Sequence, residues 1–275
     1  MKTSTRLSFL FCFFPILLSA QLIMPDPNFG TDGFVLQNLA IGYVPIEMEV
    51  YPDGSVIAMT TDNFDQFSIY RYLPDGSPDA NFGAAGQMTT DFGFSLTYPM
   101  DMKVLSNNNL YFLFEVYVWG ELVQHSNLAY VRMGTNGEIL SSSNVDLFEE
   151  SYDSFNAIEE STSGGIYICG ATDDWLYNGE HISVRGHNAS GMYQLNLSTL
   201  IGMNGTAHAV ANLPGSNYLI AGSFNGQGGI IRRNGYNSFD TSFGNDGFAI
   251  QIGGALKKVY VLENDKILAA SSNRF

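Results

Sequence analysis

The sequence predicts an all-β protein, a β-propeller of about five four-stranded blades with an incomplete last blade. Three observations predict this fold class: a motif that recurs at intervals of roughly 54 residues, short runs in which apolar and polar residues alternate, and clusters of Gly, Asn, Asp and Pro between these runs. A β-solenoid and a β-sandwich share the second and third features and are the alternatives. With 275 residues, of which 45% are hydrophobic, the chain can bury a large core as a single domain.

The first 20 residues differ in composition from the rest. Lys2 and Arg6 precede the apolar stretch 7–18, and Ala20 follows it. This pattern is typical of a secretory signal peptide, so we expect cleavage after Ala20 and a mature chain of residues 21–275. The stretch is too short to span a bilayer comfortably. We therefore expect the mature protein to be secreted or located at the cell surface, with no integral membrane segment.

The charge of the chain limits its partners, and its cysteine content limits its thiol chemistry. The sequence has 12 Lys and Arg against 27 Asp and Glu, so its potential repels nucleic acids and anionic lipid surfaces. The partners that we expect are neutral or cationic. Removal of the signal peptide also removes Cys12. Cys169 is then a single thiol in an apolar segment, which we expect to be buried and inert.

The clearest repeated motif is D-x-[NS]-F-G-x-x-G, which begins at Asp26, Asp79 and Asp240. We call it the FG signature. Each aspartate is expected to cap its own turn, and the glycines suit backbone positions with positive φ. The phenylalanines of the three copies, Phe29, Phe82 and Phe243, are expected to pack between adjacent blades.

A second landmark gives the number of copies. A turn followed by a short apolar strand recurs at positions 55, 109, 165, 217 and 266, with spacings of 54, 56, 52 and 49 residues. Within the first copy, the alternation predicts strands over 34–39, 46–51, 55–60 and 67–73. In the third copy, residues 192–200 are expected to form the strand that follows the apolar one. The copies span about 26–78, 79–132, 133–186, 187–239 and 240–275.

The fifth copy stops before its closing strand, and we therefore expect the sequence to be a fragment of a longer product. An incomplete blade leaves an unpaired β-edge. The protein is expected to be a monomer unless this edge pairs with another chain.

The FG signature and its flanks resemble the delta-60 repeat family. The segments that carry the resemblance are PDGSPDANFGAAGQMTTDFG at 74–93, DTSFGNDGF at 240–248 and YPDGSVIAM at 51–59. Copies three and four have lost the F-G-x-x-G element. The resemblance implies a bacterial secreted or surface protein with a propeller-like fold. It supplies no catalytic residues.

No motif for cofactor, nucleotide or transition-metal chemistry is present, so the sequence predicts no cofactor and no metal site. The histidines His181 and His187 are expected to lie in an exposed loop. Acidic pairs such as Glu159-Glu160 and Asp173-Asp174 are expected on solvated faces. Aspartates that could bind calcium, such as Asp26 with Asp32, lack the spacing of a calcium loop and are expected to cap turns.

One asymmetry between the copies suggests a ligand site. Copies two and three carry long connections, 116–127 and 172–191, each with a tryptophan followed by Gly-Glu and a histidine. Exposed aromatic rings with polar neighbours suit stacking on sugars or holding a peptide. Two β-ribbons whose tryptophans pack on each other would explain the same residues. The candidate ligand-binding residues are Trp119, Glu121, His125, Trp175, Tyr177, Glu180 and His181.

We therefore predict a secreted, non-enzymatic repeat protein that binds a carbohydrate or a protein or has a structural role at the cell surface. The alternative is a secreted, carboxylate-dependent hydrolase acting on glycans. The two differ in the centre of the fold: a hydrolase should place two or more carboxylates with perturbed pKa values in a central channel or deep pocket.

Overall fold

The structure, a computed structural model, describes 25–39, 42–62, 66–94, 97–119, 124–145, 152–174, 179–188, 193–234, 238–251 and 253–271. The predicted signal peptide lies outside these residues. The described chain is all-β, as predicted, and its helical elements are two 3₁₀ turns, η1 (Pro214–Ser216) and η2 (Glu263–Asp265). None of its helices is long and apolar enough to cross a membrane.

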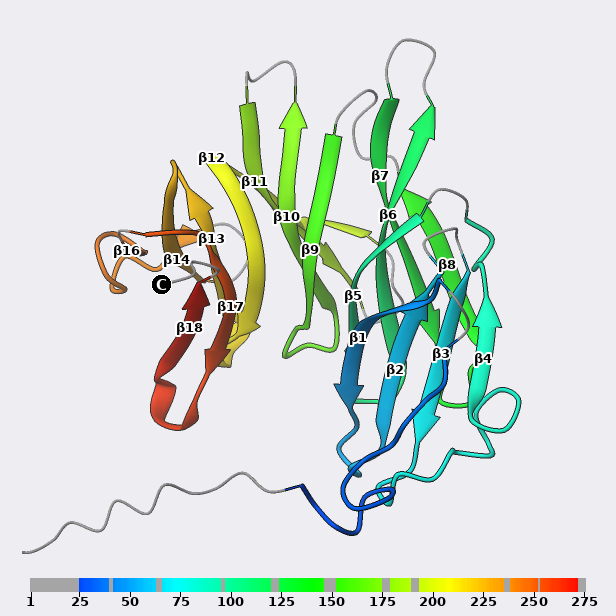
Figure 1. The fold of residues 1–275 in the computed structure, drawn as a ribbon. Helices are drawn as coiled ribbons and strands as arrows, with labels where there is room; N and C mark the ends of the chain where they lie inside the picture. The colour runs from blue at the N-terminus through cyan, green and yellow to red at the C-terminus, as the bar shows by residue number, and fades with distance from the viewer. Residues whose placement is uncertain are drawn as a thin grey trace, which may run out of the picture.

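The strands follow one another in antiparallel units of two to five strands (Figure 1). Unit 1 consists of β1 (Val44–Val50), β2 (Val56–Thr61), β3 (Phe67–Tyr72) and β4 (Gln87–Thr90). Unit 2 consists of β5 (Thr97–Val104), β6 (Leu110–Trp119), β7 (Gln124–Met133) and β8 (Ile139–Val145). In both units each strand pairs with the next one along the chain. The connection between β3 and β4 is the longest in these units and contains the second FG signature.

Unit 3 consists of β9 (Tyr152–Glu160), β10 (Ile166–Asp174), β11 (Gly179–His187) and the first part of β12 (Tyr193–Asn212). Unit 4 consists of the second part of β12, β13 (Tyr218–Phe224), β14 (Gln227–Asn234), β15 (Ser238–Phe239) and β16 (Phe248–Gln251). Unit 5 consists of β17 (Leu256–Val261) and β18 (Ile267–Ser271). The described strands form no closed barrel or closed propeller.

The hydrophobic core is divided among the contacts between successive units. Four buried apolar clusters are present, and each contains side chains from two consecutive units. Phe112 and Phe114 of unit 2, for example, pack against Phe67 of unit 1 and against Phe92 of the loop that follows it. Each unit therefore buries its apolar faces against its neighbours, as expected for sheets stacked in series.

The first strand of every unit contains an irregularity at the same place. In each, one residue has no partner in the pairing register with the second strand, which is the signature of a β-bulge. The skipped residues are Ile46, Met100, Asn156, His208 and Lys257. Their spacings, 54, 56, 52 and 49 residues, are those of the turn-and-strand landmark. The landmark positions 55, 109, 165, 217 and 266 each directly precede the second strand of a unit.

One of the four strands predicted in the first copy is wrong. Residues 34–39 contain an isolated bridge, Thr31 with Phe34, and no strand, because no described neighbour pairs with 35–39. The predictions over 46–51, 55–60 and 67–73 correspond to β1, β2 and β3. The fourth strand of unit 1 is β4, which follows the second FG signature. The second and third FG signatures therefore each link the third strand of one sheet to its outer strand.

Two expectations for copy three also require correction. The third strand of unit 3 is β11, which lies inside the connection 172–191, whereas residues 193–200 are the outer strand. His181 and His187 therefore lie in a strand and not in an exposed loop. His187 is 1% exposed, and its Nδ1 lies 2.9 Å from the Tyr111 hydroxyl oxygen.

The FG signature has the turn geometry that its sequence predicts. Oδ1 of Asp79 accepts a hydrogen bond from the amide nitrogen of Asn81, and the equivalent bonds are present at Asp26 and Asp240. All six signature glycines have positive φ, between 53° and 96°. Phe82 is fully buried, whereas Phe29 and Phe243 are half-buried. These aspartates are turn caps, as predicted.

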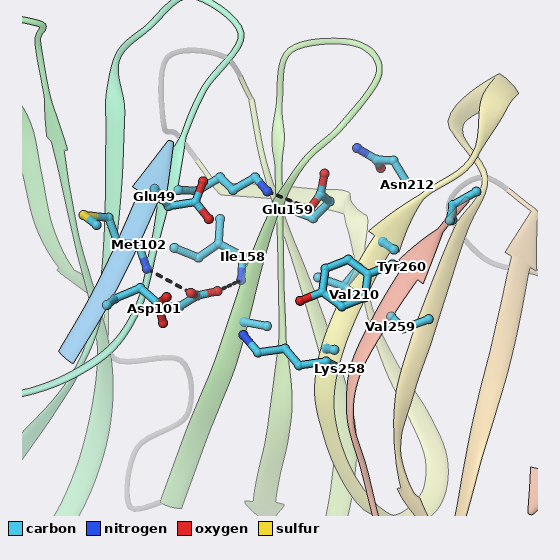
Figure 2. A pocket seen from close by; sticks show the side chains of 16 residues that line it. Glu49, Asp101, Met102, Ile158, Glu159, Val210, Asn212, Lys258, Val259 and Tyr260 are labelled. Carbon is cyan, nitrogen blue, oxygen red and sulfur yellow. Dashed lines mark hydrogen bonds and ion pairs between the residues drawn. The ribbon is translucent and has the colours of Figure 1, made fainter. Parts of the chain in front are cut away.

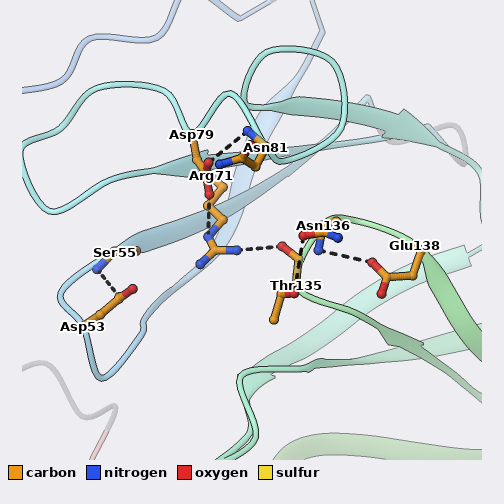
Figure 3. Close-up of polar contacts among 8 residues, drawn as sticks. All are labelled: Asp53, Ser55, Arg71, Asp79, Asn81, Thr135, Asn136 and Glu138. Carbon is orange, nitrogen blue, oxygen red and sulfur yellow. Dashed lines mark hydrogen bonds and ion pairs between the residues drawn. The ribbon is translucent and has the colours of Figure 1, made fainter.

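A feature that the sequence did not indicate is an arginine paired with the signature aspartate. Nε of Arg71 lies 3.3 Å from Oδ2 of Asp79, and Nε of Arg232 lies 2.7 Å from Oδ2 of Asp240. Nη1 of Arg71 also donates to the carbonyl oxygen of Thr135 in unit 2 at 2.6 Å (Figure 3). This contact links the third strand of one unit to the turn of the next.

Candidate functional site

The first strands of the five units surround a cavity of about 300 Å³. Its volume lies at the lower end of the range for small-molecule pockets. In Figure 1 these strands, β1, β5, β9, β12 and β17, occupy the middle of the arrangement, with β4 and β16 toward opposite sides. Because side chains alternate along a strand, residues one and three positions after each bulge face the cavity. The cavity is therefore a product of the repeat itself.

The lining residues form two layers, and both are rich in charge. The layer next to the bulges consists of Glu47, Asp101, Ala157, Ala209 and Lys258. The second layer consists of Glu49, Lys103, Glu159, Ala211 and Tyr260. Acidic side chains outnumber basic ones, so the cavity favours neutral or cationic occupants. Units 1, 2, 3 and 5 supply the charges, whereas unit 4 supplies alanine in both layers.

Asp101 is held by main-chain groups of two neighbouring strands. Its Oδ1 accepts a hydrogen bond from the amide of Met102 at 3.0 Å, and its Oδ2 accepts one from the amide of Ile158 at 2.7 Å (Figure 2). Burial raises the pKa of Asp101 to about 6, although these hydrogen bonds and Lys258 act in the opposite direction. In Figure 2, Lys258 points toward this carboxyl group.

In the second layer, Lys103 lies between two carboxylates. Its Nζ is 3.3 Å from Oε2 of Glu159, and Glu49 also interacts with it electrostatically. Burial raises the pKa values of Glu49 and Glu159, and Lys103 partly offsets this effect. Burial alone would lower the pKa of Lys103, but the two carboxylates raise it. The cavity therefore holds three carboxyl groups with raised pKa values.

Two bulge residues meet beside the cavity. Nζ of Lys257 in β17 lies 2.9 Å from Nε2 of His208 in β12. Burial and the charge of Lys257 lower the pKa of His208 to about 4. The imidazole is therefore neutral near pH 7 and can accept a hydrogen bond from the lysine.

The raised pKa of Asp101 predicts a pH dependence of stability. The folded state binds this proton more tightly than the unfolded state does, so the contribution is fully present below about pH 4 and is lost as the pH rises through about 6. The difference between about 6 and 3.8 corresponds to about 3 kcal/mol at about 1.4 kcal/mol per pKa unit. Urea unfolding between pH 4 and 7 should reveal this decline when the protein is compared with Asp101→Asn.

The control for this measurement is Asp173→Asn, at an exposed position. This substitution makes the same chemical change outside the cavity, so it shows how much of the effect belongs to any Asp-to-Asn change. A flat difference between the unmodified protein and Asp101→Asn over this pH range would contradict the assignment.

Of the seven ligand-binding residues predicted from the sequence, three lie outside the described residues. Glu121, Trp175 and Tyr177 are outside them, and the side chains of Trp119, His125 and Glu180 are not described. The two long connections are extensions of hairpins: Trp119 pairs with Gln124 in the β6–β7 ladder, and Asp173 pairs with Glu180 in the β10–β11 ladder. His181 pairs with Thr172 in the same ladder as Glu180. Both hairpins extend toward the top of Figure 1.

The acidic pair Glu159-Glu160 contradicts the expectation that such pairs lie on solvated faces. Glu159 lines the cavity, and Glu160 is half-buried and accepts hydrogen bonds from the amide and hydroxyl of Ser106 at 2.6 and 2.8 Å. That prediction is wrong for this pair, because neighbouring units cover both side chains. Asp173 is exposed, as predicted.

Metal and thiol chemistry find no support in the described part of the chain. No three His, Cys, Asp or Glu side chains there are grouped closely enough to hold a metal ion. Cys169 is fully buried, and burial raises the pKa of its thiol well above its usual value. The thiolate is therefore disfavoured.

Comparisons with known proteins found structural similarity only at low sequence identity. No protein-family model matches the sequence, and no curated protein matches it. Similar solved structures include a protein of unknown function from Bacteroides caccae, at 12% identity and a TM-score of 0.47, covering 83% of this chain and 70% of that chain. A luciferin-regenerating enzyme matches at 10% identity and a TM-score of 0.44, covering 84% of this chain and 70% of that chain. Similarity at this level transfers no residue role.

Proposed function

We propose that the mature chain is a secreted or cell-surface binding protein with a delta-60-like propeller scaffold, and that its central cavity binds a small carbohydrate. The observation that supports this proposal best is the two-layered charged lining of the cavity. Sugar hydroxyl groups donate hydrogen bonds to carboxylates and accept them from lysines, so they match this mixture of groups. The excess of acid also favours an amino sugar over an acidic one.

Binding is favoured over hydrolysis because two of the three perturbed carboxyl groups already have protein partners. Asp101 accepts two main-chain hydrogen bonds, and Glu159 pairs with Lys103. Glycoside hydrolysis needs one carboxyl group to protonate the leaving group and a second to act as nucleophile or base. A pair anchored in this way is better suited to holding a ligand in a fixed orientation.

The binding proposal is tested by calorimetric titration of the mature protein with monosaccharides and amino sugars. Glu159→Gln should weaken binding at least tenfold, because it removes a charged acceptor from the cavity and unpairs Lys103. The matched control is Glu160→Gln, which makes the same change at the adjacent residue, held by Ser106 instead. Equal losses in both variants, or no binding of any sugar in the panel, would contradict the proposal.

A secreted, carboxylate-dependent glycan hydrolase is the second candidate. It is supported by one observation: Glu49, Asp101 and Glu159 line the same cavity, and burial raises all three pKa values. Incubation with polysaccharides and chromogenic glycosides distinguishes the two functions. A binding protein releases no product, whereas a hydrolase releases product that is lost in Glu49→Gln and Asp101→Asn.

A further inference from the structure

The first FG signature contacts unit 1 as the second one contacts unit 2. The amide of Gly83 donates to the carbonyl oxygen of Asn136 in the third turn of unit 2, at 3.1 Å. The amide of Gly30, at the same place in the signature, donates to the carbonyl oxygen of Asp75 in the third turn of unit 1, at 2.7 Å. Residues 26–39 therefore occupy, beside unit 1, the place that 79–92 occupy beside unit 2.

Beside residues 87–90 lies a paired strand that also packs against unit 2. β3 pairs with β4, with Ile69 opposite Met88, and Phe67 and Ile69 bury their side chains against Phe112 of unit 2. The second and third strands of unit 1 thus cover the face of the next unit beside the outer strand. All of these side chains are buried.

Between residues 26–39 and unit 1 there is a cavity instead. It has a volume of about 260 Å³ and is enclosed by Phe29 and Val35 on one side and by Ala58, Tyr70 and Tyr72 on the other. Ala58 occupies the position in unit 1 that Phe112 occupies in unit 2. The cavity thus lies where an apolar strand packs in the neighbouring pair of units, and its lining is largely apolar.

The edge beside this cavity is also open. Phe34 is 56% exposed and Leu36 is 91% exposed, at the places where the second signature is followed by the polar residues Gln87 and Thr89. Phe34 pairs only with Thr31, through an isolated bridge, and residues 35–37 pair with no described strand. Exposed apolar residues on an unpaired edge favour the addition of a strand.

Charge complementarity identifies one residue of the strand that would fit. In the two signatures that have a third strand, the Oδ2 atom of the aspartate pairs with an arginine of that strand: Asp79 with Arg71, and Asp240 with Arg232. The main chain of each arginine also bonds to the signature, since Arg71 accepts from the amide of Asp79 and donates to the carbonyl oxygen of Gly86. In the first signature, the corresponding groups are the carboxylate and the amide of Asp26 and the carbonyl oxygen of Gly33. No described residue forms an ion pair with Asp26.

We propose that residues 26–39 and the facing side of unit 1 form an acceptor site for an extended polypeptide strand. The strand that fits has apolar residues at alternate positions, which enter the cavity, followed by an arginine that pairs with Asp26. It runs antiparallel to residues 34–37, in the register that β3 adopts on β4. This mode of recognition is β-augmentation, in which main-chain bonds give affinity and the side chains give specificity.

The test uses the mature protein and a fluorescent peptide with the sequence of residues 66–76, QFSIYRYLPDG, followed by anisotropy and by hydrogen exchange. Binding should be saturable and should protect the amides of residues 34–37. Replacement of the peptide arginine by alanine, or Asp26→Asn in the protein, should each weaken binding about tenfold or more. The two changes together should cost little more than either one alone.

Two controls make the test specific. Asp32→Asn removes the same charge from the same segment, at an exposed position with a φ of 53° that asparagine tolerates, and should leave binding unchanged. A scrambled peptide should not bind. The proposal is overturned if the peptide does not bind, if binding is insensitive to both arginine and Asp26, or if the site is filled by a second copy in a dimer that the peptide does not dissociate.

Discussion

Phe82→Ala is expected to lower the free energy of unfolding by about 3–5 kcal/mol, the range for a phenylalanine removed from a packed core. Phe82 is 0% exposed and belongs to the cluster between units 1 and 2. Its deletion leaves a cavity at the point where the signature turn docks, and the backbone there is fixed by the Gly83 amide bond to Asn136. Denaturant unfolding of the mature protein measures this loss.

The matched control is Phe29→Ala, the same substitution at the same place of the first FG signature. Phe29 is half-buried and lines an open cavity, so its loss should cost less than half as much. If the two substitutions are equally costly, the packing of the first signature must equal that of the second, and the acceptor site proposed at residues 26–39 would already be filled.

The repeat spacing could be predicted from sequence because it depends on local patterns. A turn followed by alternating apolar residues encodes a hairpin within about ten residues. Five such hairpins are present, and their second strands are β2, β6, β10, β13 and β18. The capping role of the signature aspartates is equally local, since each bonds to a residue two positions away. Features of this kind need no knowledge of the partner unit.

Residues 34–39 show where local patterns fail. Their alternation of apolar and polar side chains matches that of a strand, yet a strand forms only when a neighbour satisfies its amide and carbonyl groups. No described strand pairs with 35–39. For the same reason, the prediction for residues 192–200 places them at the wrong position in their sheet, because the sequence does not show which strand they pair with.

The central cavity could not be recognised as a site because its residues come from different units. Asp101 and Lys258 face each other across 157 positions of sequence, and no short motif joins them. A signal was nevertheless present. Glu47 with Glu49, and Asp101 with Lys103, are charged residues two positions apart, and they occupy the same place in successive copies. Alternate charges on one side of an otherwise apolar strand indicate a shared polar surface.

The candidate site at Trp119 and Trp175 stays a prediction. The ladders of β6 with β7 and of β10 with β11 support the part of that interpretation in which the connections are β-ribbons. They leave open whether the rings pack together or bind a ligand. Replacing both tryptophans by alanine separates these cases, since a ligand site loses binding and a packed pair loses stability.

Asp79→Ala is expected to destabilise the fold by about 3–5 kcal/mol, the cost of removing one partner from a buried ion pair. The side chains of Asp79 and Arg71 are 8% and 11% exposed, so the guanidinium group is left in a poorly solvated position. The substitution also removes the hydrogen bond that Asp79 accepts from the Asn81 amide. Arg71 would retain its bond to Thr135 and its position 4.3 Å from the centre of the Tyr51 ring.

The control compares this residue with its counterpart in the first signature. Asp26 has the same turn-capping bond but no described arginine partner, so Asp26→Ala should cost only about 1 kcal/mol, the value of a capping hydrogen bond. The double variant Asp79→Ala/Arg71→Met should recover part of the loss, because it removes the unpaired charge together with its partner. Strictly additive losses in urea unfolding would show that Arg71 and Asp79 do not act as a pair, and the arginine expected in the strand that docks at Asp26 would lose its basis.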